Sequence, residues 1–315
     1  MNTRKPLDSL AIGLMLILCL AWSLQQITLK ATADDFSPVL QIALRSGIAA
    51  LLVGLFMMIR RQRLSFADGN WKPGLVVGAL FAFEFLLVGE GLRFTSAAHM
   101  AVFLYTAPVF AALGLHWLLP DERLAPLQWA GITLAFAGIA TAFLLRNPEA
   151  TSGDLSQILW GDFLAVVAGA AWGATTVVIR TTSLSNMPAT QTLLYQLVAA
   201  FVLLLPAAFL LGETRFTPSP AIWSSLAFQA VVVCFASYLT WFWLLKHYLA
   251  SRLGVFSFLT PLLGVVLGAW LLHEEIEPGF LLGALMVLTG IVLVSGYGWI
   301  RQLFRGNRKA PESAL

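Results

Sequence analysis

Three polar side chains stand inside long apolar stretches of this sequence: Gln26, Arg45 and Glu84. A guanidinium binds carboxylates, a carboxylate binds cationic groups, and an amide adds hydrogen bonds to either. A charge among apolar groups is costly unless it has a partner. Two interpretations are open for Arg45 and Glu84: a permanent salt bridge between two helices, or a site for the charged groups of a small ligand. A buried carboxyl can also carry a proton, which makes Glu84 the candidate for proton coupling.

The elements that hold these residues are apolar segments. The 315 residues are 59% hydrophobic and 11% charged, which is about half the charged share of a globular protein. The mean hydropathy is +0.82. A soluble fold would expose much of this apolar surface, whereas a bilayer solvates it. Windows of about 20 residues predict an all-α integral membrane protein with ten transmembrane helices, at 9–29, 38–59, 73–93, 97–118, 126–145, 159–180, 188–211, 221–246, 251–272 and 279–299.

Depth along these segments places four side chains in one layer. Trp22, Arg45, Glu84 and Tyr105 each lie seven to nine residues from the outer end of a segment, which is about 10 to 14 Å below the surface. Gln26 follows Trp22 by one helical turn and lies near the same face. Arg45 and Glu84 are therefore at the right depth to meet.

The chain repeats itself at a shift of about 150 residues, which indicates two related units. Trp22 falls on Trp172 at a shift of 150, and Pro108 falls on Pro261 at a shift of 153. Five helices thus occur twice, and an odd number in each unit inverts the second copy. We expect a first repeat over 1–146, a second over 155–300 and a tail over 301–315. Inverted repeats are typical of secondary transporters that work by alternating access.

The second repeat lacks the two charges of the first and has aromatic and hydroxyl-bearing residues in this layer. Trp172, Tyr195 and Tyr238 correspond to Trp22, Arg45 and Phe85, and such rings suit a gate or the wall of a site. Proline inside a helix frees a carbonyl and bends the helix, so Pro108 and Pro261 are hinge candidates. The expected substrate-binding residues are Trp22, Gln26, Arg45, Glu84, Tyr105, Trp172, Tyr195 and Tyr238.

Motifs of several other function classes are absent from the sequence. It contains no G-x-x-x-x-G-K-[ST], no H-E-x-x-H and no G-x-S-x-G, and so offers no ATP-binding loop, zinc-protease site or nucleophile elbow. No Cys or His cluster has zinc spacing. We expect no catalytic residue, no metal and no cofactor. The four histidines fall near helix ends, where we expect interfacial roles: His99, His116, His247 and His273.

Lysine and arginine are distributed unevenly between the loops. With both termini cytoplasmic, fourteen of these residues lie on the inner side and four on the outer side. Loops rich in Lys and Arg stay on the cytoplasmic side. We therefore expect a multi-pass protein of the bacterial inner (plasma) membrane with cytoplasmic N- and C-termini.

Several short motifs, ordered over nearly the whole chain and in both halves, resemble the EamA family of the drug/metabolite transporter superfamily. They are Leu20-Ala21-Trp22-Ser23 with Lys30, Leu44-Arg45, Leu92-Arg93-Phe94-Thr95-Ser96-Ala97 with Pro108, and Asp121-Glu122-Arg123-Leu124. The resemblance implies ten helices in the inner membrane and, most often, export of amino acids or related small metabolites.

These features predict a secondary transporter that exports a small amphipathic metabolite, either an amino acid or an amino-acid derivative or amine, around a midplane cavity. Proton coupling is left open. The alternatives are an uptake carrier for a cationic or aromatic metabolite or drug, a channel or lipid scramblase, and a membrane-embedded enzyme. The expected partners are a small-molecule substrate and the lipid bilayer, not nucleic acid, with the protein a monomer or a homodimer.

Overall fold

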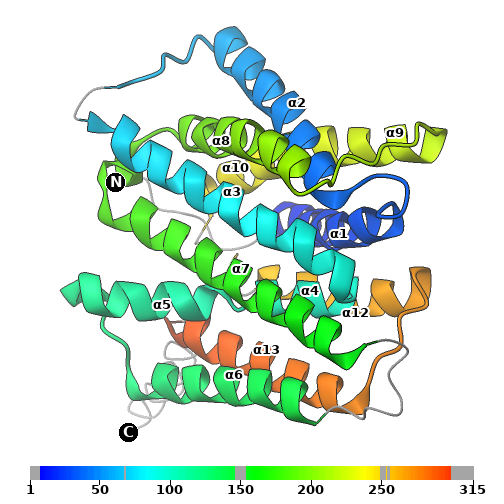
Figure 1. The fold of residues 1–315 in the computed structure, drawn as a ribbon. Helices are drawn as coiled ribbons and strands as arrows, with labels where there is room; N and C mark the ends of the chain where they lie inside the picture. The colour runs from blue at the N-terminus through cyan, green and yellow to red at the C-terminus, as the bar shows by residue number, and fades with distance from the viewer. Residues whose placement is uncertain (1–7, 67–68, 146–153, 249–252, 254–255, 299–315) are drawn as a thin grey trace, which may run out of the picture.

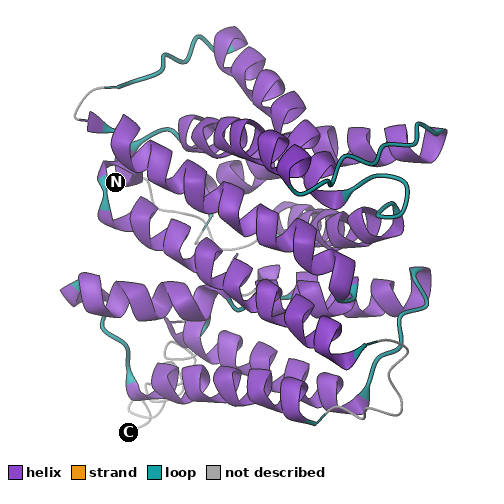
Figure 2. Cartoon of the chain, in the orientation of Figure 1, coloured by secondary structure: helices purple, strands orange, loops and turns teal. Residues whose placement is uncertain are grey.

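A computed structural model of the chain describes residues 8–66, 69–145, 154–248, 253 and 256–298. The regular structure in this part is helical (Figure 2), and an isolated β-bridge joins Phe36 to Phe216. The π-helix η4 (Phe228–Ser237) joins α9 to α10, and the 3-10 helices η2 (Pro120–Glu122) and η3 (Ser183–Asn186) lie in loops. The α-helices are α1 (Ser9–Ala31), α2 (Pro38–Ile59), α3 (Trp71–Phe94), α4 (Ala97–Leu104), α5 (Ala107–Leu118), α6 (Pro126–Leu144), α7 (Leu155–Thr181), α8 (Ala189–Leu210), α9 (Pro220–Ala227), α10 (Tyr238–His247), α12 (Leu259–Leu271) and α13 (Pro278–Ser295).

Nine helical spans in the described residues are long and apolar enough to cross a membrane, with mean hydropathy from 1.6 to 2.3. A helix satisfies its own backbone in lipid, which is why runs of this length and composition fold as helices. The prediction of an all-α membrane protein is confirmed. The tenth predicted segment ends in α12, which has 13 residues. Part of its beginning lies outside the described residues, so the count of ten helices stays a prediction.

Local sequence signals begin the helices. The Asp8 carboxylate accepts a hydrogen bond from the Ala11 amide at 2.9 Å, and the Ser96 hydroxyl accepts one from the His99 amide at 3.1 Å. Both are N-caps, which satisfy amides that have no partner in the first turn. Proline stands in the first turn of α2, α5, α6, α9 and α13, where its missing N–H costs nothing.

Helices far apart in the sequence pack in pairs. In Figure 1, α3 lies along α7, α2 along α8, and α6 along α13. Glycines let α6 and α13 approach: a Cβ on Gly138 would lie 2.6 Å from the Gly283 carbonyl oxygen, and one on Gly131 would lie 2.7 Å from that of Gly290. Small residues commonly allow this approach in membranes.

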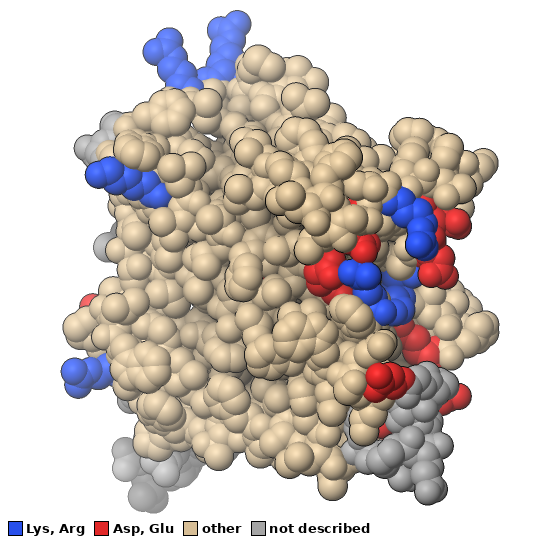
Figure 3. Space-filling model, viewed as in Figure 1, with Lys and Arg blue, Asp and Glu red and all other residues tan. Residues whose placement is uncertain are grey.

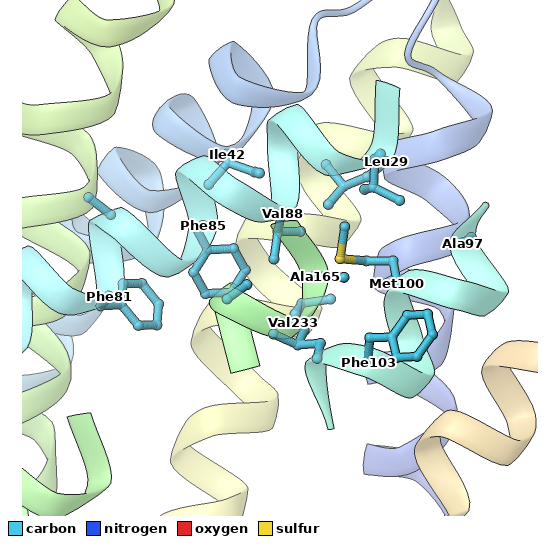
Figure 4. Packing of buried hydrophobic residues seen from close by; sticks show 14 of the residues in the cluster. Leu29, Ile42, Phe81, Phe85, Val88, Ala97, Met100, Phe103, Ala165 and Val233 are labelled. Carbon is cyan, nitrogen blue, oxygen red and sulfur yellow. The ribbon is translucent and has the colours of Figure 1, made fainter. Parts of the chain in front are cut away.

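One buried hydrophobic cluster lies where α3, α4 and α7 meet. Figure 4 shows Phe85 and Val88 of α3, Met100 and Phe103 of α4, and Ala165 of α7 gathered there, all buried. The cluster fixes the position of the middle of α3, which carries Glu84.

The outer surface is apolar as well. Figure 3 shows a broad band without charged side chains, with Lys and Arg at one edge and mixed acidic and basic residues at the other. Leu51 and Leu210 are 76% and 87% exposed. Large exposed apolar surface is unfavourable in water but natural against lipid.

Two spans are interrupted at corresponding places. α4 ends at Leu104 and α5 begins at Ala107, and Tyr105 and Thr106 between them are buried. Pro108 stands in the first turn of α5, and Pro261 is the third residue of α12, which follows Phe258. Proline has no N–H to donate to the preceding turn of a helix, and its ring clashes with the carbonyl group four residues earlier. Irregular backbone at membrane depth is tolerated where protein surrounds it or where it lines a cavity.

Candidate functional site

Arg45 is the centre of the candidate site. It stands on α2 with 1% of its surface exposed, and its Nη1 donates a short hydrogen bond to the Gln229 side-chain oxygen on η4. The guanidinium carbon lies 4.6 Å from the centre of the Phe85 ring, close enough for a cation–π contact. The Nε group of Arg45 is buried without a hydrogen-bond partner. The guanidinium therefore keeps unused donors.

Glu84 lies on α3, with 4% of its surface exposed. It is near enough to Arg45 for their charges to interact. Its carboxylate nevertheless makes no hydrogen bond or ion pair with any residue that the structure describes. The direct salt bridge considered for Arg45 and Glu84 is not formed, and the described hydrogen-bond partner of the guanidinium is Gln229.

Gln229 is a site residue that the sequence analysis missed. Its side chain is fully buried, and its Nε2 donates to the Gln25 carbonyl oxygen at 2.9 Å and to the Thr28 hydroxyl at 2.6 Å. It therefore joins α1, α2 and η4. The available signal was a lone amide in an otherwise apolar segment, the same signal that singled out Gln26. Gln26 itself is buried, and its Oε1 has no hydrogen-bond partner.

The predicted aromatic residues fall into two contacts, each between the two halves of the chain. Trp22 of α1 donates from Nε1 to the Ser237 hydroxyl at 2.9 Å, and its ring lies edge-on to Trp241 of α10 at 5.6 Å. Tyr105 lies edge-on to Trp172 of α7, with ring centres 5.3 Å apart. Trp22 and Tyr105 come from the first half and their partners from the second. These contacts form where a gate or a binding site between the halves would need them.

Two further predicted residues lie in different surroundings. Tyr238 is half-buried at the junction of η4 and α10, next to Ser237. Tyr195 of α8 packs beside Gly74 of α3, and its hydroxyl accepts a hydrogen bond from the Gln191 amide at 3.2 Å. Gly74 lies in the first turn of α3, whereas Glu84 lies near the middle of that helix. Tyr195 therefore contacts a different part of α3 from the part that carries Glu84.

The expectation for His99 was wrong. It is buried, its Nδ1 lies 3.0 Å from an oxygen of Asp162 on α7, and its ring stacks on Phe280 of α13 at 3.7 Å. Thr95 donates a short hydrogen bond to the same carboxylate, which is fully buried. The sequence analysis passed over Asp162, although an acidic residue in an apolar helix was a visible signal. This cluster holds the α3–α4 turn against α7.

A partly exposed ion-pair chain involves Glu90 and Arg93, six and nine residues after Glu84 on α3. Arg93 contacts Glu90 at 2.8 Å and Glu213 at 3.0 Å. These residues belong to the mixed-charge edge of the molecule and offer matched controls for the buried charges.

The sequence profile of the EamA-like transporter family matches two stretches of the chain, 9–144 and 159–296. The chain belongs to this family. It is a multi-pass membrane transporter of the drug/metabolite transporter superfamily rather than an enzyme, and the motifs that suggested EamA are confirmed.

Relatives of this EamA-like transporter cover most of its length. It is 25% identical to "Uncharacterized transporter YoaV" of Bacillus subtilis, over 87% of this chain and 92% of that one. It is 27% identical to "Probable amino-acid metabolite efflux pump" of Escherichia coli, over 93% and 98% of the two chains. A protein of known crystal structure shares its fold, with a TM-score of 0.65 and 20% identity over 94% and 99% of the chains.

Proposed function

We propose that this EamA-like transporter exports amino acids or closely related zwitterions by alternating access, with the substrate bound between Arg45 and Glu84. The supporting observation is the unused hydrogen-bonding capacity of the two buried charges. Arg45 donates one hydrogen bond to the described residues, and Glu84 accepts none. A guanidinium has five N–H donors and a carboxylate has two acceptor oxygens. Buried charges in membrane helices mark substrate and ion pathways.

A zwitterion matches this arrangement of charges. Its carboxylate would bind Arg45, and its ammonium group would bind Glu84. The unpartnered Oε1 of Gln26 would add an acceptor for the ammonium group. Trp22, Tyr105, Trp172 and Tyr238 would surround the apolar part of the substrate. Glu84 would carry the coupling proton when no cation is bound.

Two relatives support this substrate class and the outward direction. The proteins named "Probable amino-acid metabolite efflux pump" from Escherichia coli and Salmonella typhimurium are 27% and 26% identical to this chain. Their similarity extends over 93% and 89% of its length.

We further propose that the halves 1–146 and 155–300 are inverted repeats. The two separate matches of the family profile support this division. So do two contacts at similar places in the two halves. Thr95, before α4, donates to Asp162 of α7, and Tyr248, after α10, donates to Asp8 at the start of α1. Each contact holds the turn after the third span of one half to the first span of the other.

Labelling of single cysteines tests the orientation. If the termini are cytoplasmic and the halves are inverted, Ser219→Cys reacts with an impermeant thiol reagent from outside intact cells. Ser313→Cys reacts only after the membrane is opened. Reaction of both from the same side contradicts this arrangement.

A binding screen tests the proposed substrate class. The purified protein is heated with amino acids, with amines that lack a carboxylate, and with cationic drugs. A ligand that binds the folded state at 100 times its Kd stabilises that state by about 2.7 kcal/mol. We expect amino acids to raise the melting temperature and to drive saturable, stereoselective counterflow in proteoliposomes. Unsaturable flux would indicate a channel or scramblase, and a substrate of altered mass would indicate an enzyme.

A further inference from the structure

A groove of about 310 Å³ lies between the end of α1 and the start of α9. Thr28, Thr32, Ser224 and Ser225 contribute hydroxyl groups to its lining, the rest of the lining is apolar, from Ala31, Ala221 and Phe228, and no lining side chain is charged. Ser224 is exposed, whereas Ser225 is buried. Binding pockets for small molecules begin at about 300 Å³. The groove therefore has room for one small polar metabolite.

Two successive hydrogen bonds connect this groove to Arg45. Thr28 lines the groove, and its hydroxyl accepts a hydrogen bond from Gln229 Nε2 at 2.6 Å. The other end of the same amide, Oε1, accepts the short hydrogen bond from Arg45 Nη1. Gln229 therefore stands between the groove and the buried guanidinium.

The amide oxygen of Gln229 is an incomplete partner for Arg45. It is uncharged and takes a single N–H, while Nε of Arg45 stays buried and unpartnered. A carboxylate can accept two parallel hydrogen bonds from a guanidinium, and charge-assisted bonds of this kind are about twice as strong as neutral ones. An unmade hydrogen bond of a buried donor is unfavourable. The surroundings of Arg45 thus favour an incoming carboxylate over the amide.

We propose that Gln229 is a gate residue that holds the place of a substrate carboxylate on Arg45, and that carboxylate-bearing substrates pass between Arg45 and the outer side of the membrane through the groove between α1 and α9. This inference rests on the proposed function and adds the route on the outer side and the group that is recognised. On binding, the carboxylate displaces the amide oxygen from Nη1 and accepts two parallel hydrogen bonds, from Nη1 and Nη2.

The backbone around Gln229 suits such a movement. Gln229 is the second residue of η4, a π-helix of ten residues. Long π-helical stretches are rare, and short ones are frequent at functional sites. A local change from π to α geometry alters the direction of the side chains in that turn. Gln229 can then leave Arg45 without disturbing the ends of the span.

Substitutions of Gln229 test the gate. Gln229→Glu places a permanent carboxylate on Arg45, so we expect the KM for carboxylate substrates to rise about tenfold, since a charged competitor replaces a neutral one. Gln229→Met removes the competitor at similar size, so the KM is expected to fall about threefold while the unliganded protein melts at a lower temperature. Gln157→Glu, an exposed change on α7, controls for the added charge.

A merely structural Gln229 gives another pattern. In that case both variants lower the melting temperature and the maximal rate but leave the KM unchanged, which overturns the gate. If Gln229→Glu does not fold, the fall in KM in Gln229→Met carries the test alone.

Cysteine modification tests the route through the groove between α1 and α9. Ser224→Cys lies in the groove, and Thr214→Cys, exposed in the α8–α9 loop, is the control. We expect an anionic methanethiosulfonate to block transport by the Ser224→Cys variant but not by the Thr214→Cys variant. A transported amino acid should slow the modification of Ser224→Cys. Neither chloride nor an amine that lacks a carboxylate should slow it. Modification of Ser224→Cys with full transport overturns the route. Failure of the proposed function differs from both results, because wild-type protein then shows no saturable amino-acid flux at all.

Discussion

Arg45 and Glu84 lie close enough for their charges to interact, but they do not form an ion pair. Both are buried, at 1% and 4% exposure. A charged group at the middle of a membrane helix costs about 2.5 to 3.5 kcal/mol on insertion scales, and a direct salt bridge would have offset part of that cost for both groups. The arrangement is unfavourable for stability alone and suits a site that is completed by a ligand with both charge signs.

Glu84→Gln keeps the size of the side chain and removes its charge. We expect transport to be impaired and its dependence on pH between 5.5 and 8 to be flattened, with folding nearly intact, because no described residue relies on a hydrogen bond to this carboxylate. Glu90→Gln, six residues further along α3, serves as the control because it removes a negative charge from the ion pair with Arg93 instead. Wild-type flux at every pH in Glu84→Gln would eliminate the coupling role.

Trp172→Ala removes one ring of the edge-on pair with Tyr105. If this pair forms part of the gate, transport is lost or becomes leaky while the protein still inserts and stays monodisperse in detergent. Trp160→Ala on the same helix is the matched control, because Trp160 is 51% exposed. Loss of folding in Trp172→Ala, measured by size-exclusion chromatography, would assign the pair to packing instead.

Gly138→Ala tests the contact between α6 and α13. The new methyl group would meet backbone atoms, the Gly283 carbonyl oxygen at 2.6 Å and the Val287 nitrogen at 2.7 Å. The helices must separate, so we expect a loss of about 1 to 3 kcal/mol in the free energy of unfolding. Gly13→Ala on α1 meets nothing within 4 Å and should leave the melting temperature unchanged. Equal effects in both variants would refute close glycine packing.

The Tyr248 hydroxyl donates to both carboxylate oxygens of Asp8, at 3.0 and 2.8 Å. This hydrogen bond and, secondarily, burial raise the pKa of Tyr248 above its ordinary value. The folded state therefore favours the neutral phenol, so the stabilisation is complete below the unfolded pKa of about 10 and disappears as the pH rises through the higher folded value. The melting temperatures of wild type and Tyr248→Phe should differ by a constant amount from pH 7 to 9 and converge above that. A difference that grows with alkalinity would contradict this assignment.

Hydropathy was enough to locate the helices but not their irregularities. The predicted segment 38–59 coincides with α2 because apolar length alone decides a membrane span. The break at Tyr105 and Thr106 could be anticipated only as a bend at Pro108, since the path of the chain around a proline depends on neighbouring helices. The π-helix η4 left no signal in the sequence pattern.

The contacts of the site show the same division. Sequence depth placed Arg45 and Glu84 in one layer, and the structure brings them near each other. The sequence did not predict Gln229 as the partner of Arg45, because the choice of partner depends on how η4 is rotated against α2. His99 was misplaced for a similar reason: its position near a helix end suggested the interface, while Asp162 and Phe280 from two other helices bury it.

Counterflow of radiolabelled amino acids in proteoliposomes, with Arg45→Gln compared with Arg93→Gln, tests the central claim most directly. Arg93 belongs to the partly exposed ion-pair chain with Glu90 and Glu213, so its substitution controls for the loss of a positive charge. We predict saturable flux in wild type and Arg93→Gln, and a rise in KM of at least about tenfold in Arg45→Gln, equivalent to about 1.4 kcal/mol of lost binding. For amines that lack a carboxylate, neither substitution should change the KM appreciably. An unchanged KM for amino acids in Arg45→Gln would contradict the binding of a zwitterion between Arg45 and Glu84.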